Sequence, residues 1–259
     1  MRVRRSLSLL ATALVLVACG SSKSNTTGAP SSGGKSPLIV SAAASLQKAF
    51  ITYGTQFSAA SARFSFAGSD TLAAQIEQGV RPDVFASANT KLPAMLHSKG
   101  LVDKPVVFAA NKLVLAVPAG SSKVKSLSDV EKPGTVLVVG TPTVPVGDYT
   151  NTVLARLTPA QRRAVLANVR DREPDVTAIV GKLTQGAADA GFLYITDVKA
   201  TDGKLRAIDL PASVQPRVAY GVAVVKGAPH PSQAQQFIVG LLSGAGRNDL
   251  LADGFLPPS

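Results

Sequence analysis

The stretch Leu38-Ile39-Val40-Ser41-Ala42-Ala43-Ala44-Ser45-Leu46 joins a strand to a helix, and this join decides the fold class. Residues 38–41 form a short apolar run typical of a buried strand. Apolar residues at helical spacing follow over residues 46–57. In open parallel sheets, ligands bind beyond the carboxyl ends of the strands, where the following helices begin. The small polar residues at this junction are therefore candidate binding residues.

The same order of strand and helix recurs along the chain. Short apolar runs predict further strands at residues 63–66, 83–87, 136–140 and 191–194. Helical spacing predicts further helices at residues 72–78, 146–157 and 176–185, and two more within residues 232–253. This alternation predicts an α/β fold, with mostly parallel sheets covered by helices.

Two extended runs interrupt the alternation, at residues 112–117 and 218–225. Both are flanked by Pro or Gly, and they lie about 100 residues apart, the size of a small domain. We expect them to be strands that cross between two lobes with a ligand cleft between them. The predicted first lobe is residues 38–116 plus 222–259, and the predicted second lobe is residues 117–221.

The N-terminus has the pattern of an export signal. Arg2, Arg4 and Arg5 precede an apolar run at residues 7–18, which is shorter than the roughly 20 residues of a membrane-spanning helix. The run ends at Leu16-Val17-Ala18-Cys19, which resembles the lipobox of bacterial lipoproteins. That resemblance implies a signal peptide at residues 1–18 and a lipid anchor on Cys19, although an ordinary signal with an incidental cysteine remains the alternative. Residues 19–37, with Cys19 and then mostly small and polar residues, would form a flexible tether to the outer face of the cytoplasmic membrane.

The strongly basic composition does not predict a nucleic-acid-binding protein. The formal net charge is +11, but Lys and Arg are scattered and aromatic residues make up only 5% of the chain, with no Trp. Few side chains could therefore stack on bases. We expect instead a solvated basic surface that lies beside anionic lipid.

Four strand-to-helix junctions place hydrogen-bond donors where a ligand would bind, at residues 41–45, 66–72, 144–149 and 174–176. A helix N-terminus carries free N–H groups and a partial positive charge, so it binds anions without basic side chains. One such junction could be explained by helix capping alone. Two junctions in each predicted lobe favour an anion-binding cleft.

Several motifs strongly resemble the molybdate-binding proteins of ABC transporters. They are Val40-Ser41-Ala42-Ala43-Ala44-Ser45-Leu46, Phe66-Ala67-Gly68-Ser69, residues 73–79, Asp83-Val84-Phe85-Ala86-Ser87-Ala88, Val144-Pro145-Val146-Gly147, residues 188–194 and Gly254-Phe255. The resemblance covers residues 38–255. It implies the two-lobed type II periplasmic-binding-protein fold, a monomer without cofactor, and delivery of the oxyanion to a membrane permease.

The resemblance also implies the binding residues. The hydroxyls of Ser45, Ser69 and Tyr194 and the backbone amides near Val146 and Val176 would hold the oxyanion. Molybdenum would be held only through the oxygens of molybdate, and tungstate is nearly the same size. The family more often has Ala at the position of Val146, and this difference could narrow the pocket without removing an amide donor.

A second departure from the family is Asp70, where a small polar residue is more common. Its carboxylate either faces solvent in the first turn of a helix or accepts a hydrogen bond from a protonated anion such as hydrogen phosphate. Phosphate or sulfate binding therefore remains an alternative to molybdate binding.

Enzymatic chemistry is not expected. Ser45-Leu46-Gln47-Lys48 fits the Ser-x-x-Lys pattern of β-lactam acylating enzymes, but no Lys-Thr-Gly follows it. His97 and His230 are isolated, and no set of metal ligands is visible in the sequence. An adhesion module, the third class considered, would show no stabilisation by small molecules.

Overall fold

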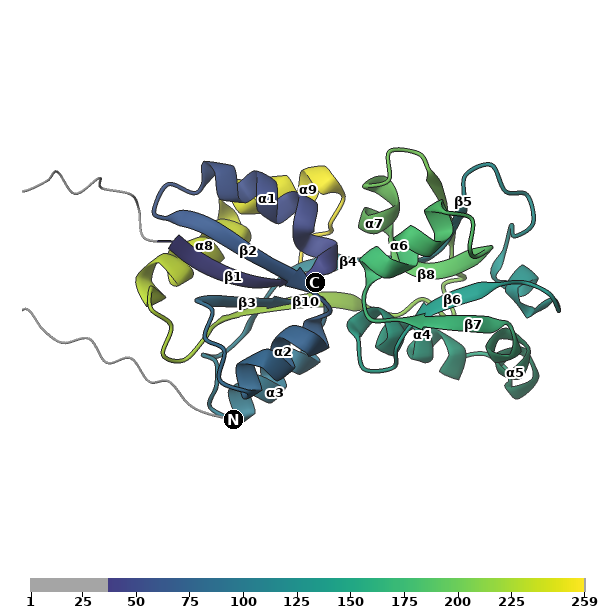
Figure 1. Ribbon diagram of the computed structural model, residues 1–259, viewed down its shortest axis with the longest axis horizontal. Helices are drawn as coiled ribbons and strands as arrows, with labels where there is room; N and C mark the ends of the chain where they lie inside the picture. The colour runs from purple at the N-terminus through teal and green to yellow at the C-terminus, as the bar shows by residue number, and fades with distance from the viewer. Residues whose placement is uncertain (1–36, 259) are drawn as a thin grey trace, which may run out of the picture. The chain divides into compact units, whose positions relative to one another are not determined.

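The structure is a computed structural model that describes residues 37–258 (Figure 1). The predicted signal peptide at residues 1–18, Cys19 and all of the predicted tether except Pro37 lie outside the described residues. Within residues 37–258, no helix has both the length and the hydropathy needed to cross a bilayer.

The first lobe is built on a mixed sheet with the strand order β2-β1-β3-β10-β4. Its strands are β1 (Pro37–Ala43), β2 (Ser61–Ala67), β3 (Val84–Ser87), β4 (Val106–Asn111) and β10 (Val218–Val224). β1 pairs in parallel with β2 and β3, whereas β10 lies antiparallel between β3 and β4.

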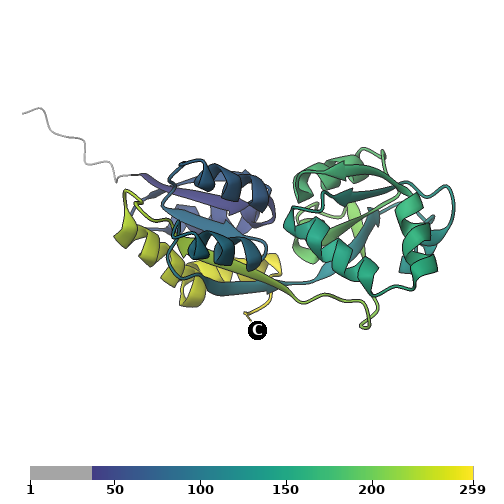
Figure 2. The ribbon, with the colours of Figure 1, turned by 90° about the horizontal axis from the view of Figure 1, so that it is seen from below.

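Helices cover both faces of this sheet. They are the short 3₁₀ helix η1 (Ala44–Leu46), α1 (Gln47–Gln56), α2 (Ser69–Glu77), α3 (Lys91–Ser98), α8 (Pro231–Ser243) and α9 (Ala245–Asp253). α1 and α9 lie on one side of the sheet, and α2 and α3 lie on the other (Figures 1 and 2). Phe50 and Phe237 fill the core on the first side, and Leu72 and Leu96 pack against Phe85 on the second.

The second lobe repeats this arrangement, with the strand order β7-β6-β8-β5-β9. Its strands are β5 (Leu113–Pro118), β6 (Leu137–Gly140), β7 (Val169–Glu173), β8 (Ala190–Tyr194) and β9 (Leu205–Asp209). Its helices are η2 (Leu127–Glu131), α4 (Pro145–Ala155), α5 (Pro159–Ala167), α6 (Val176–Thr184) and α7 (Ile195–Lys199). β6 is parallel to β7 and β8, and β5 is antiparallel to β8 and β9.

The chain changes sheets at different residues from those predicted. β4 ends at Asn111, and β5 pairs with the second sheet from Leu113 onward, so residues 113–116 belong to the second lobe. On the return, Val218 already pairs with Asn111 of β4, so residues 218–221 belong to the first lobe. The predicted boundaries at 116 and 222 were misplaced, because β5 and β10 each pair with the sheet of the next lobe from their first residues onward. β5 and β10 run antiparallel to both of their neighbours, so both sheets are mixed.

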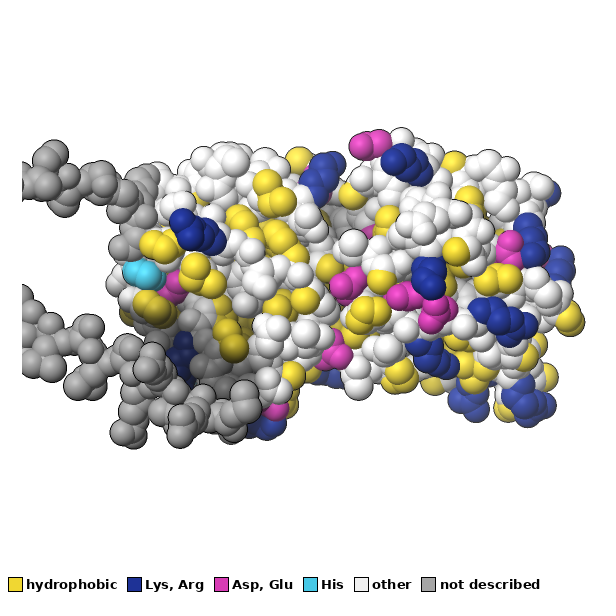
Figure 3. Space-filling model, viewed as in Figure 1, with side chains coloured by type: hydrophobic (Ala, Val, Ile, Leu, Met, Phe, Trp, Pro, Cys, Tyr) yellow, Lys and Arg dark blue, Asp and Glu magenta, His cyan; other side chains and the backbone are white. Residues whose placement is uncertain are grey.

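Charged side chains are interspersed on the face of the molecule drawn in Figure 3. Lys and Arg lie among Asp and Glu there, and more of the basic side chains lie over the second lobe. On this face the pattern is that of a solvated basic surface.

Candidate functional site

A small cavity lies between the lobes, where the strands of both sheets lead into helices. Its lining includes all five residues predicted from the sequence to bind the ligand, namely Ser45, Ser69, Val146, Val176 and Tyr194. The volume in which the centre of a water-sized molecule fits is about 20 Å³. One water needs roughly 10–15 Å³ on this measure, so the cavity suits a compact ligand.

Three helices begin at this cavity. In each helix, the first backbone amide that donates to a backbone carbonyl at the helix start lies in the first turn. These amides belong to Leu72 in α2, Asp148 in α4 and Ile179 in α6. The amides of Ser69, Val146 and Val176, which precede them, have no backbone acceptor within their own helix. Their N–H groups give the cavity a partial positive charge.

Ser69 is held in place as a hydrogen-bond donor. Its side chain is buried at the start of α2, and its Oγ accepts a hydrogen bond from the backbone N–H of Ala88 at 3.1 Å. Because a hydroxyl has only one proton and this bond uses a lone pair, the proton of Ser69 is left to donate into the cavity.

Tyr194 carries an unpaired donor. It ends β8, its side chain is only 1% exposed, and its hydroxyl has no hydrogen-bond partner among the described residues. Burial, with the neighbouring Tyr220 and Tyr149, holds the pKa of this phenol well above its usual value, so it stays protonated. A buried hydroxyl without a partner is uncommon in native proteins, and a bound acceptor would remove the anomaly.

Side-chain charge at the cavity is limited to one acid. None of the described residues that line it is Lys, Arg or His, and its only acidic residue is Asp175. Asp175 caps α6, because its Oδ1 accepts from the N–H of Ala178 at 3.0 Å. An anion here would thus be held by hydroxyls and helix amides rather than by cationic side chains.

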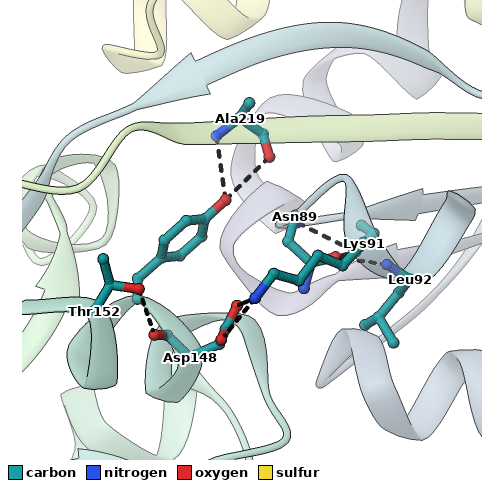
Figure 4. Close-up of polar contacts among 8 residues, drawn as sticks. Asn89, Lys91, Leu92, Asp148, Thr152 and Ala219 are labelled. Carbon is teal, nitrogen blue, oxygen red and sulfur yellow. Dashed lines mark hydrogen bonds and ion pairs between the residues drawn. The ribbon is translucent and has the colours of Figure 1, made fainter. Parts of the chain in front are cut away.

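Further contacts join the two lobes beside the cavity. Lys91 of α3 reaches across to Asp148 of α4, with its Nζ 2.7 and 2.9 Å from the two carboxylate oxygens (Figure 4). The hydroxyl of Tyr149 lies 3.3 Å from both the N and the O of Ala219. These contacts hold α4 against the first lobe.

Asp70 takes part in the same set of contacts and does not line the cavity. Its Oδ2 accepts from Thr143 Oγ1 of the second lobe at 2.7 Å, and its Oδ1 accepts from the N–H of Thr71 at 2.8 Å. The carboxylate therefore lies in the first turn of α2, as predicted, but it contacts the second lobe. Both oxygens have donors already, so the geometry gives no support to the hypothesis that Asp70 accepts a proton from the ligand.

A larger cavity of about 290 Å³ adjoins the site, and Ser45 and Val176 line both. Asp197 and Asp253 also line the larger cavity, and burial raises the pKa of Asp197 to about 7. Acidic side chains disfavour an anion, so the smaller cavity is the better candidate. Lys48 pairs with Asp253 at 3.2 Å, whereas Ser45 contacts Tyr220, so the structure does not pair Ser45 with Lys48 as acyl-enzyme chemistry requires.

Some contacts at the site were not predicted from the sequence. Tyr220 lies beside Ser45, and its hydroxyl is 2.9 Å from Ser45 Oγ. Asn111, Thr143 and Lys91 also contribute contacts near the cavity. The extended run at residues 218–225 predicted a strand around Tyr220, but nothing in that run indicated a partner 175 residues away in the chain.

Comparisons with known proteins show what the chain is similar to. The family model for bacterial extracellular solute-binding proteins matches residues 38–256. The chain is 36% identical over 250 residues to the molybdate-binding protein ModA of Mycobacterium bovis, covering 94% of this chain and 93% of the relative. It is 33% identical to the protein of the same name from Haemophilus influenzae over 205 residues, which cover 74% and 77% of the two chains.

The fold is also shared with a solved structure. The periplasmic molybdate-binding protein of Azotobacter vinelandii superposes with a TM-score of 0.76 at 21% identity, covering 86% of this chain and all of the other. The predicted two-lobed periplasmic-binding-protein fold is thereby confirmed. The resemblance to molybdate-binding proteins that the sequence motifs indicated is confirmed by the two relatives.

Proposed function

Because the chain belongs to the bacterial extracellular solute-binding protein family, we propose that it captures molybdate outside the cytoplasm for an ABC import permease. The observation that carries this proposal is the hydroxyl of Tyr194, which is buried at the cavity and has no hydrogen-bond partner among residues 37–258. Molybdate would supply the missing acceptor. The relatives named as molybdate-binding proteins support the choice of anion.

The donors of the cavity suit a fully deprotonated dianion. The hydroxyls of Ser45, Ser69 and Tyr194 and the amides of Val146 and Val176 would each donate to an anion oxygen. Hydrogen phosphate carries a proton that would need an acceptor, and among the described residues that line the cavity only Asp175, whose Oδ1 caps α6, has a carboxylate to offer. Sulfate has the charge and shape of molybdate but is smaller, so we propose that size separates the two. Tungstate, nearly equal in size to molybdate, should also bind.

The affinity follows from the number of donors. Hydrogen bonds to charged groups contribute about 1.5–3 kcal/mol each. Five of them, less the cost of desolvation and closure, correspond to a dissociation constant in about the micromolar to nanomolar range.

Thermal unfolding in four anions tests the proposal. Molybdate and tungstate, at about a thousand times their dissociation constants, should add roughly 4 kcal/mol, or about 8–16 °C in melting temperature. Sulfate and phosphate should add little. The Asp70→Ser variant serves as a control and should keep this anion preference. A large shift with phosphate that disappears in the variant would favour a phosphate-binding protein, and no shift with any anion would refute oxyanion binding.

We also propose that the protein is anchored through an acylated Cys19 and acts as a monomer. The lipobox-like Leu16-Val17-Ala18-Cys19 supports the anchor. Cys19→Ser should release the protein from the membrane fraction, since charge alone anchors weakly. Retention of the variant on membranes after a high-salt wash would contradict the lipid anchor.

A further inference from the structure

Tyr220 lies behind the cavity and contacts one of its donors. Its ring is fully buried on β10, and its hydroxyl does not line the cavity. That hydroxyl is 2.9 Å from Ser45 Oγ and 3.4 Å from Asn111 Nδ2. In the first contact, either the hydroxyl of Ser45 or that of Tyr220 could be the donor. The contact with Asn111 determines which of them donates.

Asn111 is buried at the end of β4, where the chain crosses between the lobes. Its Oδ1 accepts from the N–H of Lys112 at 2.8 Å, which fixes the orientation of the side-chain amide. The Nδ2 group is therefore on the side of Tyr220, and it also donates to Thr196 Oγ1 of the second lobe at 2.9 Å. An NH₂ group can only donate, so the oxygen of Tyr220 must accept from Asn111.

The direction of the next bond follows from the count of protons. With one lone pair of Tyr220 used by Asn111, its single proton is directed to Ser45 Oγ. The opposite arrangement, in which Ser45 donates to Tyr220, would leave the buried proton of Tyr220 without an acceptor among the contacts of this hydroxyl. An unsatisfied buried donor costs about 1–3 kcal/mol. Burial also raises the pKa of Tyr220 well above its usual value, so the phenol keeps its proton.

We propose that Asn111 and Tyr220 are positioning residues that hold the Ser45 hydroxyl as a donor toward the cavity. Because Ser45 Oγ accepts from Tyr220, its own proton is free to be donated to a ligand oxygen. The arrangement thus favours an anion whose oxygens carry no proton and can each accept a hydrogen bond. This inference rests on the proposed oxyanion-binding function and adds residues that set its specificity.

A double-mutant cycle with calorimetric titration tests it, using sodium molybdate and sodium phosphate as probes at neutral pH. Tyr220→Phe keeps the ring and removes the proton directed at Ser45. We expect molybdate to bind about tenfold more weakly and phosphate to lose less, so that the ratio of the two dissociation constants narrows. In a Ser45→Ala background, Tyr220→Phe should change molybdate binding by less than about twofold, because the two residues act as one unit.

Tyr53→Phe is the matched control, since it removes another buried hydroxyl, one that donates to Phe237 O at 3.2 Å outside the cavity. It should leave both affinities unchanged. If Tyr220→Phe does not melt as a folded protein, Asn111→Leu carries the same test, because Tyr220 is then free to accept from Ser45. The inference would be overturned if Tyr220→Phe reduced molybdate affinity equally with and without Ser45, or if the ratio of the two dissociation constants did not change. Either result would leave the proposed oxyanion-binding function standing. An unmodified protein that binds neither anion would overturn the proposed function and this inference together.

Discussion

The two lobes contribute to the cavity in different ways. Besides the amides at the start of α2, the first lobe supplies two side-chain hydroxyls that already have partners, Ser69 with the amide of Ala88 and Ser45 with Tyr220. The second lobe supplies helix amides at the starts of α4 and α6, and the hydroxyl of Tyr194, which has no partner among the described residues. Donors of the first lobe are thus oriented by the protein itself. The Tyr194 donor gains an acceptor only with an anion in the cavity, so the ligand should stabilise the closed arrangement of the lobes.

A second difference concerns how closely the lobes approach. Gly68 begins the turn into α2. A Cβ built on it would lie 2.5 Å from the carbonyl oxygen of Pro174 in the second lobe and 2.9 Å from Asp70 Oδ1 in the first lobe. Real Cβ contacts of 2.5 Å essentially never occur. The absence of a side chain at Gly68 therefore allows the second lobe to bring its donors to the anion.

The largest expected effect comes from Gly68→Ala. The backbone angles of Gly68, φ −56° and ψ 136°, suit alanine. Within the first lobe the added Cβ meets the end of the Asp70 side chain, which can rotate away, so this lobe should still fold. The added methyl group should keep the second lobe and its donors away from the anion. Losing two or three charge-assisted hydrogen bonds would weaken molybdate binding by at least about a hundredfold. Titration with molybdate, alongside melting of the ligand-free protein, measures both effects.

Gly181→Ala is the control for this change, because a Cβ at Gly181 in α6 would meet no atom of the described residues within 4 Å. It should leave binding unchanged and raise stability slightly through helix propensity. Normal molybdate affinity in Gly68→Ala would show that the close approach to Pro174 is dispensable.

The difference between the hydroxyls of the two lobes should appear as a difference in stability. Tyr194→Phe and Ser69→Ala should each weaken molybdate binding about tenfold, since each removes one donor to a charged ligand. Tyr194→Phe should leave the ligand-free protein as stable as before, because the hydroxyl of Tyr194 makes no hydrogen bond to the part of the chain that the structure describes. Ser69→Ala leaves the buried amide of Ala88 unpaired and should cost about 1–3 kcal/mol. Equal melting temperatures for the two ligand-free variants would contradict this account of Ser69.

Much of the architecture could be predicted from the sequence, because apolar periodicity marks elements that are buried. The strand predicted at residues 38–41 is β1, and the helix predicted at residues 176–185 is α6. The edge strand β7 was missed, since Arg170, Asp171 and Arg172 give it no apolar pattern. The short helix α7 was missed as well, because five residues are too few for periodicity to show.

At the candidate site, too, some residues could be predicted from the sequence and others could not. All five residues inferred from the motifs line one cavity, and their binding of an anion stays a prediction. The residues behind them could not be predicted, because the contact between Ser45 and Tyr220 joins positions far apart in the chain. Single-sequence patterns report local order along the chain and carry no information on such pairs.

The smallest expected effect concerns the ion pair between the lobes, Lys91 with Asp148, whose side chains are 71% and 29% exposed. Exposed ion pairs contribute about 0.2–1 kcal/mol, so Lys91→Met should speed molybdate release by no more than about fivefold. Salt should speed release from the native protein more than from the variant, because salt screens the pair that the variant lacks. Stopped-flow release measured at low and high salt gives both quantities.

Lys99→Met is the matched control, since Lys99 pairs with Glu77 at 2.7 Å within the first lobe and the net charge falls equally. If both variants changed release and its salt dependence alike, the cause would be the overall charge, and the Lys91 pair would have no part in holding the lobes together.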